Sequence, residues 1–259
     1  MKSRSRRLAE FIAPPLLLFV VVLLLWHAGV RHFDLKPFQL PVPFAVFDEG
    51  RANARDLGIA TLLTGSVAAL GFVCSLILGV VIAFFFAQSV LIQRAFYPYA
   101  IFLQTIPVVA VAPLIIQWCG PGYASIVVTS TILSLFPVIT NATTGLTATN
   151  ANMEELFQLY GATRLQRLFK LQLPQSIPYI VAGAKIASGL SVIGAVIGEF
   201  FASFGGANSG LGVIIYMTSS QSEIAYCFAA IMCSTALGLA MFTAVSVIGG
   251  LLTRRWRMG

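Results

Sequence analysis

Long apolar runs separated by short polar segments dominate the chain. Each run is close to or longer than the about 20 residues that a helix needs to cross a bilayer. The pattern therefore predicts an all-α polytopic membrane protein with six transmembrane helices, at positions 11–30, 57–88, 94–118, 123–146, 175–204 and 224–252. We expect three parts: a first helix with an external connector (1–56), a transmembrane domain (57–252) and a short tail (253–259).

The first apolar run follows a basic start, as a secretory signal peptide would. It is longer than the about 7 to 15 residues of a signal core, and no small-x-small cleavage site follows. We interpret it as an uncleaved helix, with a cleaved signal as the alternative. The next segment, 31–56, is polar, and Pro41 and Pro43 argue against a regular helix around them, which predicts an irregular external connector.

Glycine and proline mark features inside two of the runs. Three small residues, Gly65, Gly71 and Gly79, would let the second helix approach its neighbours closely. The third run contains Pro98, Pro107 and Pro113 and cannot be one straight helix. Irregular backbone at membrane depth is tolerated where it faces protein or a watery cavity. The polar side chains of Gln104 and Thr105 lie just before the break at Pro107, so these three residues are a candidate wall of a solute pathway. The alternative is a helix that is kinked for packing alone.

Composition agrees with a membrane protein, since 58% of residues are hydrophobic, only 10% are charged and the mean hydropathy is +0.89. The net charge of +7 does not form one patch that would predict a nucleic-acid partner. With the N-terminus inside, eleven basic residues fall in the inner segments and four in the outer ones. This asymmetry predicts that both termini and the segment 152–174 are cytoplasmic.

That segment is the one long amphipathic stretch in the chain. Asn152 and Glu155 have the spacing of a capping box, and Gly161 supplies a residue that can end the helix in a left-handed conformation. Thr163 and Gln166 repeat the box for a second helix, which we expect to stop before Pro174. An interfacial helical hairpin whose caps are only caps is one interpretation.

The same spacing resembles the cytoplasmic EAA loop of ABC importer permeases, E-A-A-x3-G-x9-I-x-L-P. The glutamate, the glycine and the final leucine-proline are in register, while the two alanines are Leu156 and Phe157 and the isoleucine is Leu171. Other pieces between 40 and 217 resemble permeases of the nitrate/sulfonate/taurine type. They are Leu40–Pro43, the run Thr105–Leu114, Ala184–Ala187, Glu199 and Gly210–Gly212.

The resemblance implies a type-I importer fold in a bacterial inner membrane, with residues 57–252 as the ABC transmembrane domain. It implies a homodimer of six-helix subunits surrounded by lipid, two cytoplasmic ATPase subunits that bind ATP and Mg, and an external substrate-binding protein. It assigns attachment to the ATPase to the loop residues Glu155, Leu156, Phe157, Tyr160, Gly161, Ala162, Leu171 and Pro174.

Glu199 stands near the outer end of the fifth run and resembles an acidic residue that recurs there in the family. One interpretation is an interfacial carboxylate that stays solvated. The other is a part of the outer gate, accepting hydrogen bonds from N–H groups of the loop 205–212, which includes Gly210 and Gly212.

Other classes of protein find less support. The chain has no Gly-x4-Gly-Lys-Ser/Thr phosphate loop, so ATP would be hydrolysed by another chain, and no cofactor is expected in this one. A secondary transporter would show internal repeats and an ionisable relay near mid-membrane, and apart from the ends of the runs only Lys185 and Glu199 are charged within them. A membrane-embedded enzyme would need clustered polar groups at one depth, and the four cysteines suggest buried thiols rather than a metal site. No residue selects the solute among nitrate, sulfonates, taurine and vitamin precursors.

Overall fold

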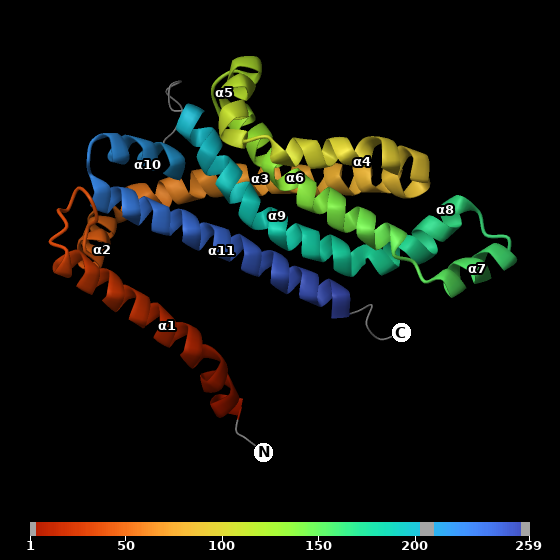
Figure 1. Cartoon of the computed structure of the whole chain (residues 1–259), viewed down its shortest axis with the longest axis horizontal. Helices are drawn as coiled ribbons and strands as arrows, with labels where there is room; N and C mark the ends of the chain where they lie inside the picture. The colour runs from red at the N-terminus through yellow and green to blue at the C-terminus, as the bar shows by residue number, and fades with distance from the viewer. Residues whose placement is uncertain (1–3, 203–209, 255–259) are drawn as a thin grey trace.

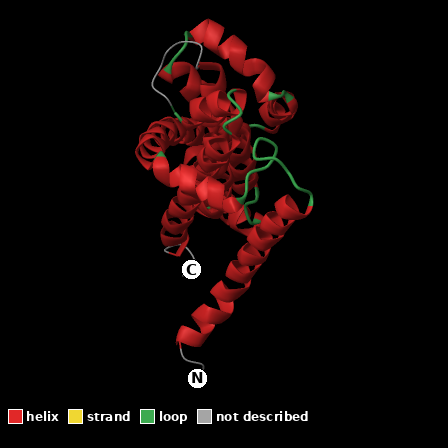
Figure 2. Ribbon diagram, turned by 90° about the vertical axis from the view of Figure 1, so that its left-hand side faces the viewer, coloured by secondary structure: helices red, strands yellow, loops and turns green. Residues whose placement is uncertain are grey.

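The computed structural model describes residues 4–202 and 210–254, and every regular element in those ranges is helical (Figure 2). The bounds, in chain order, are α1 (Arg4–His32), α2 (Pro43–Ala52), α3 (Ala54–Gln88), α4 (Val90–Thr105), α5 (Val108–Cys119), α6 (Tyr123–Thr147), α7 (Ala151–Leu159), α8 (Arg164–Arg167), a π-helical turn (Leu168–Gln172), α9 (Leu173–Ala202), α10 (Leu211–Ser220) and α11 (Ile224–Arg254).

Five helices in the described ranges are long and apolar enough to cross a membrane: α1, α3, α6, the continuous helix 164–201 and α11. The third predicted crossing is instead split into α4, with 16 residues, and α5, with 12 residues. The break falls at Ile106 and Pro107, whose backbones are extended, and α5 leaves the direction of α4 there (Figure 1). The expected break is confirmed, whereas Pro98 and Pro113 lie inside helices without ending them.

The core is built on α6, which packs along both α3 and α9. A Cβ at Gly79 of α3 would lie 2.6 Å from Val138 Cγ1, and one at Gly194 of α9 would lie 2.7 Å from Ser130 Cα. A Cβ at Gly71 would collide with the Ser130 side chain. The predicted close approach at Gly71 and Gly79 is therefore confirmed, because only hydrogen fits between these helices.

Small polar side chains at the same interfaces join the helices. The Ser130 hydroxyl donates to the Ser191 carbonyl on α9 at 2.8 Å, and Thr131 Oγ1 donates to the Gly71 carbonyl on α3 at 3.3 Å. Ser130 and Thr131, both on α6, are buried. Hydrogen bonds between helices, together with close packing, replace the hydrophobic driving force that helices lack in lipid.

The connector differs from the prediction. Pro43 opens α2 instead of preventing a helix, because a proline at the first helical position loses no intrahelical hydrogen bond. Pro43, which was expected in an extended piece, thus begins a helix. Helix α3 starts at Ala54, three residues before the predicted start at 57. Helix α10 was also not predicted. Of the cysteines, which were expected to be buried, only Cys227 is; Cys74 and Cys233 are half-buried, and Cys119 is exposed.

Figure 1 shows how the elements are distributed between the two ends of the molecule. The hairpin of α7 and α8 lies at one end, and the last turn of α11 points to the same end. Helices α2 and α10 lie at the opposite end. Helix α1 diverges from the rest, and only 6% of its apolar span is buried.

Candidate functional site

The first half of the amphipathic hairpin is helix α7, and its cap lies two residues earlier than predicted. Asn150 is the N-cap, and its side-chain oxygen accepts from the Asn152 N–H at 3.0 Å. The predicted capping box of Asn152 with Glu155 is therefore wrong, because both residues already lie inside the helix. As a consequence, the Glu155 carboxylate is not used for capping.

The turn between the two helices follows the prediction. Gly161 has φ +67°, the left-handed region that side-chain-bearing residues enter at a cost. The Ala162 N–H donates to the Phe157 carbonyl at 2.9 Å, which closes the end of α7. Thr163 and Gln166 form the predicted reciprocal capping box, with the Thr163 N–H on Gln166 Oε1 at 2.9 Å.

The second helix does not stop before Pro174. It widens into the π-helical turn Leu168–Gln172 and continues as α9. The Leu173 N–H donates to the Leu168 carbonyl, five residues earlier, so the chain absorbs one extra residue. Pro174 falls directly after this register shift, as the second residue of α9, and the helix continues past it.

The residues assigned to ATPase attachment divide into exposed and buried ones. Tyr160 is 84% exposed and Leu156 43%, and Glu155 and Gly161 are also exposed. Phe157, Ala162 and Pro174 are half-buried, and Leu171 is buried in the protein at 4% exposure. Leu159, which is 84% exposed, was not predicted and belongs to the same surface.

Charge on the hairpin is arranged asymmetrically. Glu154 pairs with Arg167 across the turn at 3.4 Å, joining α7 to α8. Among the residues that the structure describes, the neighbouring Glu155 takes part in no ion pair. The hairpin thus presents exposed apolar side chains beside a carboxylate that is free to accept a partner.

At the opposite end of α9, Glu199 is buried, with 3% of its surface exposed. Its Oε1 accepts from the Thr64 hydroxyl of α3 at 2.8 Å, and its Oε2 accepts from the Gly212 N–H of α10 at 2.7 Å. The same Thr64 oxygen accepts from the Leu211 N–H at 2.9 Å. The solvated-anchor interpretation is therefore wrong. Acceptance from an N–H of the 205–212 segment is confirmed.

We call Thr64, Glu199, Leu211 and Gly212 the outer polar cluster, after the predicted place of Glu199 near the outer end of its run. It fixes the first turn of α10 against α3 and α9, and Gly210 is the N-cap of α10. A Cβ at Gly210 would collide with the Glu199 carboxylate, and one at Gly212 would collide with the Val196 carbonyl. Gly212 lies in a helix rather than in the predicted loop, and residues 205–209 of that loop lie outside the described ranges.

The break between α4 and α5 borders a cavity of about 590 Å³. Of the three residues predicted as a pathway wall, Gln104 lines this cavity, whereas Thr105 and Pro107 do not. Thr105 instead donates to its own helix at the Phe102 carbonyl, at 2.8 Å. The other walls come from α4, α5, α6 and α9: Ala100, Ile106, Val108, Ile132, Leu133, Leu135, Phe136, Pro137, Ile139 and Leu190.

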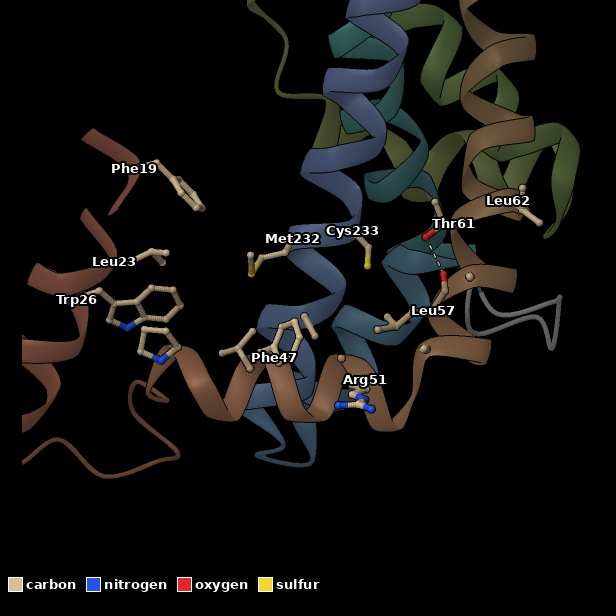
Figure 3. A pocket seen from close by; sticks show the side chains of 16 residues that line it. Phe19, Leu23, Trp26, Phe47, Arg51, Leu57, Thr61, Leu62, Met232 and Cys233 are labelled. Atoms are coloured by element: carbon tan, nitrogen blue, oxygen red, sulfur yellow. Dashed lines mark hydrogen bonds between the residues drawn. The ribbon is translucent and has the colours of Figure 1, made fainter. Parts of the chain in front are cut away.

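A larger cavity of about 810 Å³ lies between α1, α2, α3 and α11 (Figure 3). Phe19, Trp26, Phe47 and Met232 surround it, and Arg51 is the one charged residue among the described residues that line it. The walls of this cavity are mostly apolar, and so are those of the cavity at the α4–α5 break, so wall polarity does not distinguish the two. The α4–α5 break stays the candidate for the solute pathway, because the predicted polar residue Gln104 and the interrupted backbone meet there.

The outer polar cluster holds the residue that sequence reasoning missed. Thr64 resembles any other threonine in an apolar run, and it lies 135 positions before Glu199. No local pattern marks such a pair. The one available signal was a buried acidic residue, which needs a donor from some neighbouring helix.

Comparisons with known proteins agree with this architecture. Residues 75–258 match the family model "Binding-protein-dependent transport system inner membrane component". The chain is 32% identical to the formylaminopyrimidine transport permease protein ThiX of Halalkalibacterium halodurans, covering 94% of this chain and 95% of the relative. It is 31% identical to the riboflavin transport system permease protein RibX of Chloroflexus aurantiacus (99% and 96%), and 26% to a putative aliphatic sulfonates transport permease protein, SsuC, of Bacillus subtilis (86% and 80%).

The family match covers more than half of the chain, on a helical fold with five long apolar spans. Systems of this family depend on a binding protein, and this component of them resides in the inner membrane. The chain therefore belongs to the binding-protein-dependent transport inner-membrane components, as the multi-pass, non-enzymatic permease subunit of an ABC transporter for small solutes.

Proposed function

We propose that two copies of this chain form the pathway of a type-I importer with six crossings per subunit, α4 and α5 together making the third. Two ATPase subunits would bind ATP and Mg below it, and an external binding protein would deliver the solute. The observation that carries the proposal is the α7–α8 hairpin. This hairpin at one end of the bundle is held by helix caps and by the Glu154–Arg167 ion pair. It exposes Leu156, Leu159 and Tyr160.

The proposed orientation places that hairpin and both termini in the cytoplasm. Eleven basic residues against four support this choice by the positive-inside rule. The grouping of the hairpin with the end of α11, and of α2 with α10 at the other end, is compatible with it (Figure 1). Helices α2 and α10 would then face the binding protein.

In this arrangement the hairpin attaches the ATPase. Its exposed apolar side chains lie beyond the membrane and favour a groove on a partner protein, where their burial is worth about 25 cal/mol per Å². Glu155 would pair with a basic residue of the ATPase, and Gly161 would hold the angle between α7 and α8. A close, desolvated charge pair loses about 2 to 5 kcal/mol when one partner is truncated.

At the other end, the outer polar cluster would hold α10 in place as part of the outer gate. Its hydrogen bonds join three helices that are far apart in the sequence, at 2.7 to 2.9 Å for the three shortest bonds. A gate element must move, and a small set of directional bonds is easier to break and remake than a large apolar interface. Glu199 would thus act by positioning α10 rather than by contacting the solute.

For the solute class we propose a small nitrogen heterocycle. Two relatives that are more than 30% identical over nearly the whole chain carry formylaminopyrimidine and riboflavin in their names, whereas the sulfonate relative is 26% identical. The membrane-spanning part of this chain is poor in cations, with Lys185 the only one in the predicted runs apart from their ends. An anion would need such a charge or several donors along its way.

Reconstitution tests the proposal. The permease, co-expressed with its ATPase and incorporated into proteoliposomes with the binding protein, should accumulate solute only when ATP is enclosed on the ATPase side. The alternative, a secondary transporter, predicts uptake that a proton or sodium gradient drives without the ATPase. Failure of the ATPase to co-purify, together with gradient-driven uptake, would reject the importer assignment.

A further inference from the structure

The cavity at the α4–α5 break has a chemical character that goes beyond a passive channel wall. Its volume of about 590 Å³ lies within the range of small-molecule sites. It is lined from four helices, so each wall is held by a different part of the fold. Among the described residues that line it none is charged, and Gln104 is the one with a polar side chain.

Two kinds of hydrogen-bonding group border the cavity. The Gln104 amide offers both a donor and an acceptor, and its residue is exposed at the end of α4. On α6, Pro137 has no N–H and cannot donate the intrahelical bond that the Leu133 carbonyl would otherwise accept. Both Leu133 and Pro137 line the cavity, so the gap that this proline leaves in the hydrogen-bond ladder of α6 lies beside it.

The remaining walls are apolar, with the half-buried Phe136 as the aromatic one. An aromatic ring next to an amide favours a flat, polarisable solute that carries its own donors and acceptors at the ring edge. Nitrate or a sulfonate would enter without a cation to meet it, which is strongly unfavourable in an apolar site.

We propose that this cavity is a solute-binding station of the permease, in which Gln104 hydrogen-bonds and Phe136 stacks on a neutral nitrogen heteroaromatic ring. The inference rests on the proposed importer function and adds that the permease itself discriminates, not only the binding protein. The second permease copy would close the open side of the station.

Direct binding tests this inference without the binding protein. The permease–ATPase complex in nanodiscs is titrated with tritium-labelled formylaminopyrimidine and, separately, with riboflavin. We expect saturable binding of at least one probe, displaced by the same unlabelled compound and unaffected by millimolar nitrate or methanesulfonate. Absence of saturable binding of both, or displacement by either anion, would overturn the proposal. Release of the probe on exchange into lipid of another acyl length would instead assign the cavity to lipid and overturn it as well.

Matched variants locate the binding. Gln104→Leu and Phe136→Leu should each weaken binding about five- to tenfold, as expected for one net hydrogen bond or one stacking contact. The controls are Gln117→Leu on α5 and Phe102→Leu on α4, both exposed residues that do not line the cavity. Equal affinity for all four variants would reject the site.

Uptake measured in parallel separates the two claims. ATP-driven uptake by the wild-type assembly with no saturable binding to the permease would refute the station and leave the importer proposal standing. Saturable binding to the permease without ATP-driven uptake would support the station and refute the importer proposal. The wild-type competition by anions needs no variant, and so remains decisive if Gln104→Leu or Phe136→Leu fails to assemble.

Discussion

Replacing Thr64 with valine tests whether the outer polar cluster holds α10 in place. The Thr64 hydroxyl has two partners, because it donates to the Glu199 carboxylate at 2.8 Å and accepts from the Leu211 N–H at 2.9 Å. Valine keeps the shape of the side chain and removes both bonds. All three groups are buried, so water does not replace the lost partner.

The expected cost follows from the two groups left without that partner. A buried polar group that loses its hydrogen bond costs about 1 to 3 kcal/mol, so Thr64→Val, which affects two groups, should destabilise the local structure by about 2 to 6 kcal/mol. Thr61→Val on the same helix is the matched control. Thr61 donates to the Leu57 carbonyl of its own helix at 2.6 Å, and its other side-chain partner is the half-buried Cys233 of α11, so its loss leaves the hydrogen bonds to α10 intact.

The assay is amide hydrogen exchange of the permease in nanodiscs, followed by mass spectrometry. Exchange in the first turn of α10 should be on the order of 30-fold faster or more in Thr64→Val, the equivalent of about 2 kcal/mol. Thr61→Val should exchange there like the wild type. Equal protection of α10 in the two variants would refute the role assigned to the cluster.

Three further predictions concern coupling, topology and the gate. Glu155→Ala or Gly161→Val should leave the permease inserted but abolish uptake and reduce co-purification of the ATPase; undiminished yield and transport from both would reject the coupling role. In a variant whose native cysteines are replaced, an impermeant thiol reagent outside intact cells should label Asp48→Cys and miss Gln166→Cys. The reverse labelling pattern would show that the orientation is inverted. Glu199→Gln should still assemble, because its amide oxygen can accept the hydrogen bond from α10, but it should slow uptake. Uptake at the wild-type rate would leave Glu199 without a role in gating.

The hairpin offers its own control for the coupling prediction. Glu154→Ala removes the pair with Arg167 at the surface, which is worth about 0 to 1 kcal/mol, and leaves Glu155 in place. If coupling depends on Glu155 as a contact to the ATPase, Glu154→Ala should retain most of the uptake. Equal loss in both variants would point to the stability of the hairpin rather than to a contact.

Features that depend on neighbouring residues could be predicted from the sequence. The apolar runs place α3, α6 and α11 to within a few residues, because each needs only its own length and hydrophobicity. The Thr163–Gln166 capping box and the left-handed Gly161 are equally local. The close approach at Gly71 was predictable for the same reason, although not its partner Ser130.

Features that depend on competing or distant interactions were mispredicted or missed. A proline can end a helix or begin one, and Pro43 begins α2 while Pro174 is passed by a π-helical turn. Whether a proline ends or begins a helix depends on which donors hydrogen-bond to the neighbouring carbonyls, and these donors cannot be predicted from the local sequence. The bond from Thr64 to Glu199 spans 135 positions and follows only from how α3 and α9 pack.

The proposed sites lie on one continuous helix, which does not stop before Pro174 as predicted. One helix runs from Arg164 to Phe201, 38 residues and about 55 Å long. It carries the hairpin at one end and Glu199 near the other, and Leu190 between them lines the cavity at the α4–α5 break. A displacement of the hairpin must therefore shift this helix as a body or bend it at the π-helical turn, where its hydrogen-bond ladder is already altered. In the first case the cavity wall and the outer polar cluster move together with the hairpin, and in the second they do not.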